Sequence, residues 1–275
     1  MKKKICFFTG TRAEYGLLNP LMQKVKDEGE FQIQIIVSGM HMSPEFGLTY
    51  KEIEQDGFTI DEKVEILLSS DTDIGVSKAM GLGLVSFSDS LKRLSPHTLI
   101  VLGDRFEALS VAISAYVMKI PIVHLYGGEI TEGALDEGFR HSITKMSYLH
   151  FTSTEEYRKR VIQLGENPER VFNVGAIGLD NIKNLKLLNL QTLEKELNLD
   201  FGEKNILFTY HPVTLDTEKL SEELDQIFGA LEELIFQGYK IIITKSNADQ
   251  GGRFINKYID DFSSNIKKKF LLIEI

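Results

Sequence analysis

The sequence predicts an α/β protein in which parallel β-sheets are covered by helices on both faces. Short apolar runs alternate with longer amphipathic segments along the chain, and polar, glycine-containing turns follow several of these runs. An apolar run without polar alternation is typical of a strand that is buried on both sides, and repeated strand–helix–strand order indicates a parallel sheet.

The first half of the chain contains the clearest of these patterns. Apolar runs predict strands at residues 5–9, 33–38, 98–102, 122–125, 148–152 and 171–174. Helical periodicity predicts helices at residues 17–27, 74–94, 107–118 and 155–164.

A polar, Leu- and Asn-rich stretch at residues 180–203 is the expected linker between two domains, 1–180 and 181–275. The second domain is expected to hold strands at 206–210, 240–244 and 270–274 and a long helix at 218–237. Three strands form a small sheet beside the usual ~4–6. We therefore expect the second domain to be incomplete in this chain.

The composition is that of a globular protein, with 43% hydrophobic and 26% charged residues among 275. A net charge of −9 argues against a nucleic-acid or anionic-membrane partner. No apolar stretch approaches the roughly 18 residues of a membrane helix, and we expect that the short apolar run near the start does not act as a signal peptide. The single cysteine, Cys6, is expected to be a buried thiol. We expect a cytoplasmic protein.

Ligands of open parallel sheets bind beyond the carboxyl ends of the strands, so polar residues that follow predicted strands are candidates for a site. In the first such loop, residues 9–16, free backbone amides and Arg12 suit a phosphate. The alternative is a tight turn with a solvent-facing arginine. The loop has no Gly-x-Gly-x-x-Gly fingerprint and the chain has no P-loop, so dinucleotide or ATP use is not indicated.

Two further loops carry carboxylates. Asp104 and Arg105 follow the strand at 98–102 and suit an acid or base beside an anion-binding group, or else a local pair that caps the next helix. In the loop at 124–141, two glycines precede four carboxylates, which suit divided acid and base roles or else form a solvated acidic loop. His124 is expected to be a core histidine with satisfied nitrogens, and no His or Cys spacing supports a metal site.

The second half offers two more loops, at residues 210–214 and 246–252, each of which follows a predicted strand. Proline fixes the first loop and suits the aiming of His211 at a phosphate or sugar. The alternative is that either loop is a simple turn, although their position after adjacent strands moderately favours a functional role.

Seven segments together carry a resemblance to a known family. They are G-T-R-A-E-Y-G at 10–16, S-G-M-H-M at 38–42, G-D-R at 103–105, G-G-E at 127–129, R-H-S-I-T-K at 140–145, H-P-V-T at 211–214 and S-N-A-D at 246–249. In this order they resemble the hydrolysing UDP-N-acetylglucosamine 2-epimerases. Residues 152–157 and 163–166 look like the bacterial sialic-acid branch of that family.

The resemblance implies two Rossmann-like domains of the GT-B type, with a UDP-sugar bound in the cleft between them, and a homo-oligomer. It also implies a two-step reaction that needs no metal or nicotinamide cofactor. A base removes the C2 proton of the N-acetylglucosamine unit while UDP leaves from C1. Water then adds to the glycal and gives N-acetylmannosamine and free UDP.

Carried over to this chain, the resemblance implies that Asp104 and Asp136 are two catalytic carboxylates. Many members have a glutamate before the Gly-Gly pair where this chain has Tyr126, so Glu129 after the pair is the expected replacement. His211 is assigned with the catalytic residues. The expected substrate-binding residues are Arg12, His41, Arg105, Tyr126 and Asn247.

The family also has a Gly-Asn-Ser-Ser loop and a glutamate that hold UDP, with no counterpart up to Ile275, so we expect this chain by itself to bind UDP poorly. Three other functions remain open. One is the same chemistry on a UDP-bacillosamine-type sugar of the legionaminic acid route, the second is a GT-B glycosyltransferase, and the third is a non-catalytic sugar-nucleotide-binding module.

Overall fold

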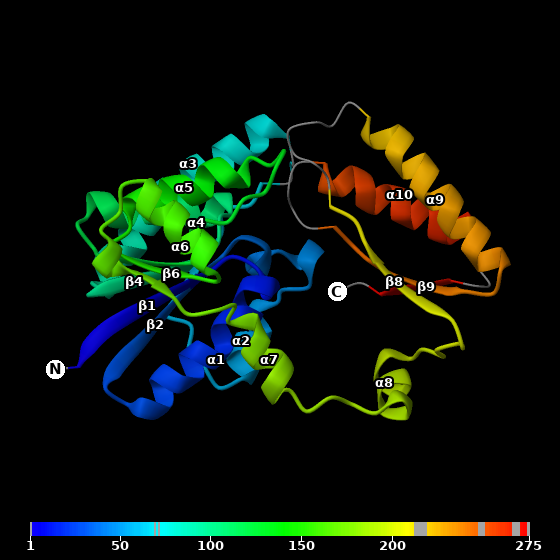
Figure 1. The fold of residues 1–275 in the computed structure, drawn as a ribbon, viewed down its shortest axis with the longest axis horizontal. Helices are drawn as coiled ribbons and strands as arrows, with labels where there is room; N and C mark the ends of the chain where they lie inside the picture. Colours follow the sequence, from blue (N-terminus) through cyan, green and yellow to red (C-terminus); the bar gives the residue numbers. More distant parts are fainter. Residues whose placement is uncertain are drawn as a thin grey trace. The chain divides into compact units, whose positions relative to one another are not determined.

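The computed structural model describes residues 2–68, 70, 72–211, 219–246, 251–265 and 270–273. Contacts within the chain divide it into two compact units (Figure 1). The first contains Met1–Ser70 and Ile74–Leu185, and the second consists chiefly of Lys186–Ile275.

The described residues of the first unit form a seven-stranded sheet in which every neighbouring pair is parallel. Its strands are β1 (Lys3–Thr9), β2 (Phe31–Ser38), β3 (Glu62–Val64), β4 (Thr98–Leu102), β5 (Ile122–Leu125), β6 (Leu149–Thr152) and β7 (Val171–Asn173). Their spatial order is β3-β2-β1-β4-β5-β6-β7. The direction of winding therefore reverses between β1 and β4, and a reversal of this kind brings the loops after the two strands together at the carboxyl edge.

Helices cover both faces of this sheet, as Figure 1 shows. One face carries α3 (Asp73–Leu94), α4 (Phe106–Val117), α5 (Asp136–Met146) and α6 (Glu155–Gln163), and the other carries α1 (Arg12–Glu28), α2 (Tyr50–Gln55) and α7 (Gly178–Asn184). Because successive strand residues point to opposite faces, Cys6 and Phe8 pack in the α3–α4 core, whereas Phe7 packs against α1. Both faces of β1 are buried, which explains its uninterrupted apolar sequence.

The second unit is a smaller parallel sheet of order β10-β9-β8 in its described residues. Its elements are α8 (Leu190–Leu197), β8 (Asn205–Thr209), α9 (Leu220–Phe236), β9 (Lys240–Thr244), α10 (Gly252–Asn265) and β10 (Phe270–Ile273). Residues of α9 and α10 form one core with alternate residues of β8 and β9, so both helices cover the same face. The α/β prediction is therefore confirmed in both units.

Several element bounds differ from the prediction. Helix α1 begins at Arg12, before the predicted residue 17, because Thr11 caps it and accepts a hydrogen bond from the backbone N of Glu14 at 3.2 Å. Helix α5 begins at Asp136, inside the stretch 124–141 that the sequence predicts as one loop. The predicted linker at 180–203 contains α8 and the end of α7.

The sequence patterns also do not predict α2, β3 or α10, nor the short 3₁₀ helices Gly39–Met42, Pro44–Phe46 and Pro168–Arg170. Most of these are too short to show a periodicity of their own. In the described part of the chain, no helix combines the length and apolar character that crossing a membrane requires.

Candidate active site

The carboxyl edge of the first unit's sheet gathers most of the predicted site residues. Arg12 follows β1, while Asp104 and Arg105 follow β4. Tyr126 and Glu129 follow β5, the next strand in the sheet. Because all these strands are parallel, their carboxyl ends lie at one edge.

Arg140, on the first turns of α5, connects two of these loops. Its guanidinium forms an ion pair with Asp104, which follows β4. It also donates to the carbonyl of Glu129 at 2.8 Å and to the Thr131 hydroxyl at 2.9 Å, both of which follow β5. Arg140 is only 3% exposed, so it is a fixed link and not a mobile surface charge.

The ion pairs at the end of β4 differ from the local pairing that the sequence allows. Asp104 pairs with the distant Arg140, and Arg105 pairs instead with Glu107, at 3.2 Å from Nε to Oε2. Arg105 is the N-cap residue of α4, but its side chain makes no capping hydrogen bond. The local Asp104–Arg105 pair that would cap α4 is therefore not formed.

The Gly127–Glu129 segment is held from several directions. Gly128 has φ +83°, and a side chain there would collide with the backbone of Tyr157 on α6. Its carbonyl accepts from Arg160 at 2.5 Å. The Glu129 carboxylate, half-buried, accepts from the Ser153 hydroxyl at 2.7 Å.

Tyr126 occupies the position where many family members have a glutamate, and its backbone has φ +65°. A non-glycine residue in this left-handed region is uncommon and often marks a functional constraint. The hydroxyl accepts a hydrogen bond from the backbone N of Gly178 at 3.3 Å, which ties the loop after β5 to α7.

The loop after β1 differs from its predicted role as a free phosphate-binding turn. The Glu14 carboxylate accepts from the backbone N of Gly10 at 2.6 Å and of Thr11 at 3.1 Å. The expectation that these two amides are open to a ligand is therefore wrong. Arg12 is half exposed and pairs with Glu52 at 2.9 Å.

Two buried carboxylates surround Arg105. Glu107 is fully buried against it, and Glu14 is 7% exposed. Burial raises the pKa of Glu14 to about 7, an effect that Arg105 opposes and Glu107 reinforces. The Arg105 side chain is 12% exposed, so this cluster does not enclose it completely.

His41 and His124 are fully buried. In His41, Nε2 lies 3.0 Å from the Thr9 hydroxyl and Nδ1 lies 2.8 Å from the Thr49 hydroxyl, so both ring nitrogens have a partner. Burial lowers the pKa of His41 to about 4. A direct substrate contact by His41 would require these bonds to break.

His124 donates from Nε2 to the Gly103 carbonyl at 2.7 Å, and its Nδ1 lies 3.2 Å from the Thr144 hydroxyl. Burial lowers its pKa to about 3. The prediction of a satisfied core histidine is confirmed. Since Gly103 directly precedes Asp104, this histidine also fixes the backbone from which Asp104 projects.

Asp136 is the first residue of α5 in the first unit and is half-buried. The other predicted residues, His211 and Asn247, belong to the second unit. His211 is exposed, and its Nδ1 lies 3.4 Å from the hydroxyl of the buried Ser246. Asn256 of α10 holds both backbone polar groups of Ser246, at 2.7 and 3.0 Å. Asn247 lies outside the described residues.

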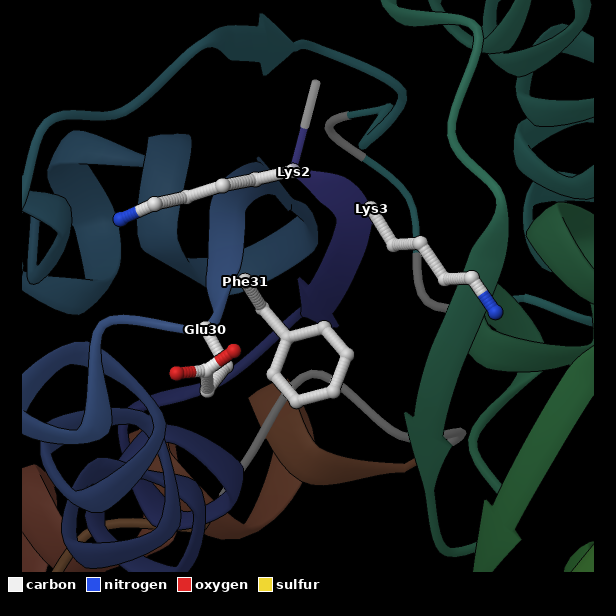
Figure 2. Close-up of a pocket in the computed structure, with 4 residues that line it drawn as sticks. All are labelled: Lys2, Lys3, Glu30 and Phe31. Carbon is white, nitrogen blue, oxygen red and sulfur yellow. The ribbon is translucent and has the colours of Figure 1, made fainter.

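Among the described residues no group of three or more His, Cys, Asp or Glu side chains is arranged to hold a metal ion. A surface hollow lined by Lys2, Lys3, Glu30 and Phe31 lies at the amino ends of β1 and β2 (Figure 2). This is the edge opposite the gathered loops, and open parallel sheets bind ligands at the carboxyl edge. We therefore place no active site in that hollow.

Sequence reasoning missed several residues that organise this edge. Glu14 had a local signal, because Thr11 followed three residues later by a glutamate is the capping-box pattern. Arg140 and Ser153 lie in the family-like segments 140–145 and 152–157, but nothing there indicates their partners, because the side chains they contact lie 9–36 residues away in sequence.

The chain is similar to known proteins over nearly all its length. A family model described as UDP-N-acetylglucosamine 2-epimerase matches residues 23–274. The GDP/UDP-N,N'-diacetylbacillosamine 2-epimerase (hydrolyzing) of Campylobacter jejuni is 44% identical over 99% of this chain and 70% of its own length. Polysialic acid biosynthesis protein P7 of Escherichia coli is 40% identical over 98% of this chain and 68% of its own length.

The fold is also shared with solved structures. The UDP-GlcNAc 2-epimerase from Neisseria meningitidis superposes with a TM-score of 0.77 at 19% identity, over 99% of this chain and 72% of that chain. At this identity the likeness concerns the fold alone. The family match and the two relatives go further: the chain belongs to the UDP-N-acetylglucosamine 2-epimerase family.

Proposed function

We propose that the protein is a hydrolysing 2-epimerase of a nucleotide-linked 2-acetamido sugar. The observation that carries the proposal is the Arg140 link, which holds Asp104 and the Glu129 loop together at the carboxyl edge of the first unit. The chemistry requires carboxylates in fixed positions around a sugar carbon, and fixed positions are what this link provides.

The proposed reaction has two steps. In the first, a carboxylate takes the proton from C2, the C2–H electrons form a C1=C2 bond, and the C1–O bond breaks so that the nucleoside diphosphate leaves. In the second, water supplies a hydroxyl to C1 and a proton is added to C2 from the opposite face. The free 2-epimer and the nucleoside diphosphate are the products.

We assign removal of the C2 proton to Glu129. Its carboxylate is held by a neutral hydroxyl, whereas the charge of Asp104 is already engaged by Arg140. Asp104 and Asp136 then serve the second step, in which a water is oriented and a proton is delivered. His211 and Asn247 are proposed to meet the nucleotide from the second domain.

The diphosphate is proposed to bind Arg12 and Arg105. Arg105 is fixed in place by Glu107. Arg12 must leave Glu52, and an exposed ion pair of this kind is worth only about 0–1 kcal/mol, so a diphosphate can compete for it.

We rank the candidate substrates by the sequence identity of the relatives that are named for them. The relative at 44% identity is named for N,N'-diacetylbacillosamine, linked to GDP or UDP, which makes UDP-N,N'-diacetylbacillosamine the first candidate. UDP-N-acetylglucosamine is the second, supported by the motif resemblance and by the family model described as UDP-N-acetylglucosamine 2-epimerase.

To test this, the full protein encoded by the gene is incubated with each of the two UDP-sugars separately, and the release of UDP and of the free sugar is followed by NMR. We expect the free 2-epimer and UDP in equal amounts from one of the two substrates. Glu129→Gln and Asp104→Asn should reduce turnover to a small residual rate. Glu132→Gln, which changes an exposed carboxylate of the same loop, is the matched control and should not. UDP released only with an added acceptor sugar would indicate a glycosyltransferase, and binding without turnover would indicate a sugar-nucleotide-binding module.

A further inference from the structure

The residue that follows β6 reaches the carboxylate assigned to C2 proton removal. The Ser153 hydroxyl donates to Oε1 of Glu129 at 2.7 Å. Strands β5 and β6 are parallel neighbours that pair Leu125 with Phe151, so the chain leaves both at the same edge. The backbone N of Tyr126 donates to the Phe151 carbonyl at 2.9 Å and extends this pairing into the loop.

Ser153 itself lies between two anchored threonines. The buried Thr152 hydroxyl donates to the Thr154 carbonyl at 3.2 Å. The Thr154 hydroxyl accepts from the backbone N of Tyr157 at 3.2 Å and caps α6. The serine hydroxyl is therefore presented by a strand end and a helix start, and sites on such rigid elements are more precise than sites on loops.

Apart from the Ser153 contact, Glu129 and its neighbour Gly128 are held through their backbone carbonyls. Arg140 holds the Glu129 carbonyl and Arg160 holds the Gly128 carbonyl. Those contacts fix the main chain but leave the carboxylate free to rotate about its side-chain bonds. We propose that Ser153 is a positioning residue, which orients the Glu129 carboxylate toward the C2 proton of the sugar. The proposal rests on the function proposed above.

A misplaced base slows proton transfer more than it weakens binding, because the substrate is also held by groups remote from C2. Ser153→Ala should lower kcat by about 10–100-fold, since a displacement of about 1 Å costs up to about 10²-fold. KM should stay within about threefold, because uniform binding is unchanged. Ser153→Thr keeps the hydroxyl and should restore most of kcat.

Thr154→Ala is the matched control. It removes the neighbouring hydroxyl, and with it the cap of α6, but not the contact with Glu129. It should lower the melting temperature with kcat unchanged. A loss of kcat in Thr154→Ala equal to that in Ser153→Ala would overturn the proposal, because loosening of α6 would then explain both.

A double-mutant cycle separates this proposal from the function on which it rests. If Ser153 acts through Glu129, Ser153→Ala should have no further effect on the residual kcat of Glu129→Gln. If Glu129→Gln lowers kcat but Ser153→Ala does not, or if the two losses multiply in the double variant, the positioning role is refuted and the proposed function stands. If Glu129→Gln keeps the kcat of the unmodified protein, both assignments are wrong.

Discussion

Replacing Arg140 by methionine tests whether this residue holds the candidate site together. The change keeps an unbranched side chain in a 3% exposed position but removes the positive charge from beside Asp104. It also deprives the Glu129 carbonyl and the Thr131 hydroxyl of a donor. Arg140→Met should therefore destabilise the first unit and displace both loops.

The size of the effect follows from burial. Removing one partner of a buried ion pair costs about 3–5 kcal/mol. The Asp104 side chain is 24% exposed and can recover some hydration, so we expect the lower end, about 3 kcal/mol. For a unit of this size, that corresponds to a fall in melting temperature of roughly 6–12 °C.

Thermal unfolding followed by circular dichroism measures this effect in Arg140→Met, Asp104→Asn and the double variant. In the Asp104→Asn background the cost of Arg140→Met should shrink by at least about 1 kcal/mol, because no buried charge is then left unpaired. A melting temperature unchanged by Arg140→Met, or the same loss in both backgrounds, would refute the reasoning.

Three further outcomes are expected. Gly128→Ala should cost at least about 2 kcal/mol in urea unfolding, because φ is +83° and the added methyl meets the Tyr157 backbone; a cost below that of an ordinary surface change would contradict this. The pKa of Glu14 in the folded protein is about 7, above its ordinary 4.5, so between these values Glu14 is protonated in the folded protein but ionised in the unfolded one. The folded protein therefore loses stability as pH rises from 4.5 to 7. Glu14→Gln should thus gain stability relative to the unmodified protein by roughly 3 kcal/mol between pH 4.5 and 8, and a pH-independent difference would count against it. With pKa values near 4 and 3, His41 and His124 stay neutral in the folded protein, so their contribution to stability is present above pH 6.5 and is lost as pH falls. Their imidazole NMR signals should therefore not shift between about pH 8 and 5. A titration midpoint near pH 6.5 would show that the two side chains are not buried.

The edge of the sheet could be predicted from sequence because each of its parts has a local signal. The apolar run at Thr98–Leu102 marks a buried strand, and Asp104 follows it directly. Glu129 lies in the loop that follows the next strand, which ends at Leu125. Parallel pairing then requires the two to lie at one edge, although nothing in the sequence says how far apart they are.

The partners of these residues could not be predicted, because they depend on the packing of distant segments. Asp104 pairs with Arg140, 36 residues later, although Arg105 is its immediate neighbour. Arg105 lies beside Glu107 because both belong to the start of α4. The hydrogen bonds of the Gly10 and Thr11 amides, in contrast, could have been predicted. The sequence contains the T-x-x-E capping-box pattern, whose glutamate, Glu14, accepts from both amides.

The most direct test of the account is the fate of the C2 proton. The protein as its gene encodes it is incubated in deuterated water with UDP-N,N'-diacetylbacillosamine and, separately, with UDP-N-acetylglucosamine, and C2 of the released sugar is followed by NMR. The account predicts a free 2-epimer that carries deuterium at C2, formed together with an equal amount of UDP and lost in Glu129→Gln. A released sugar that keeps its original C2 proton would contradict it.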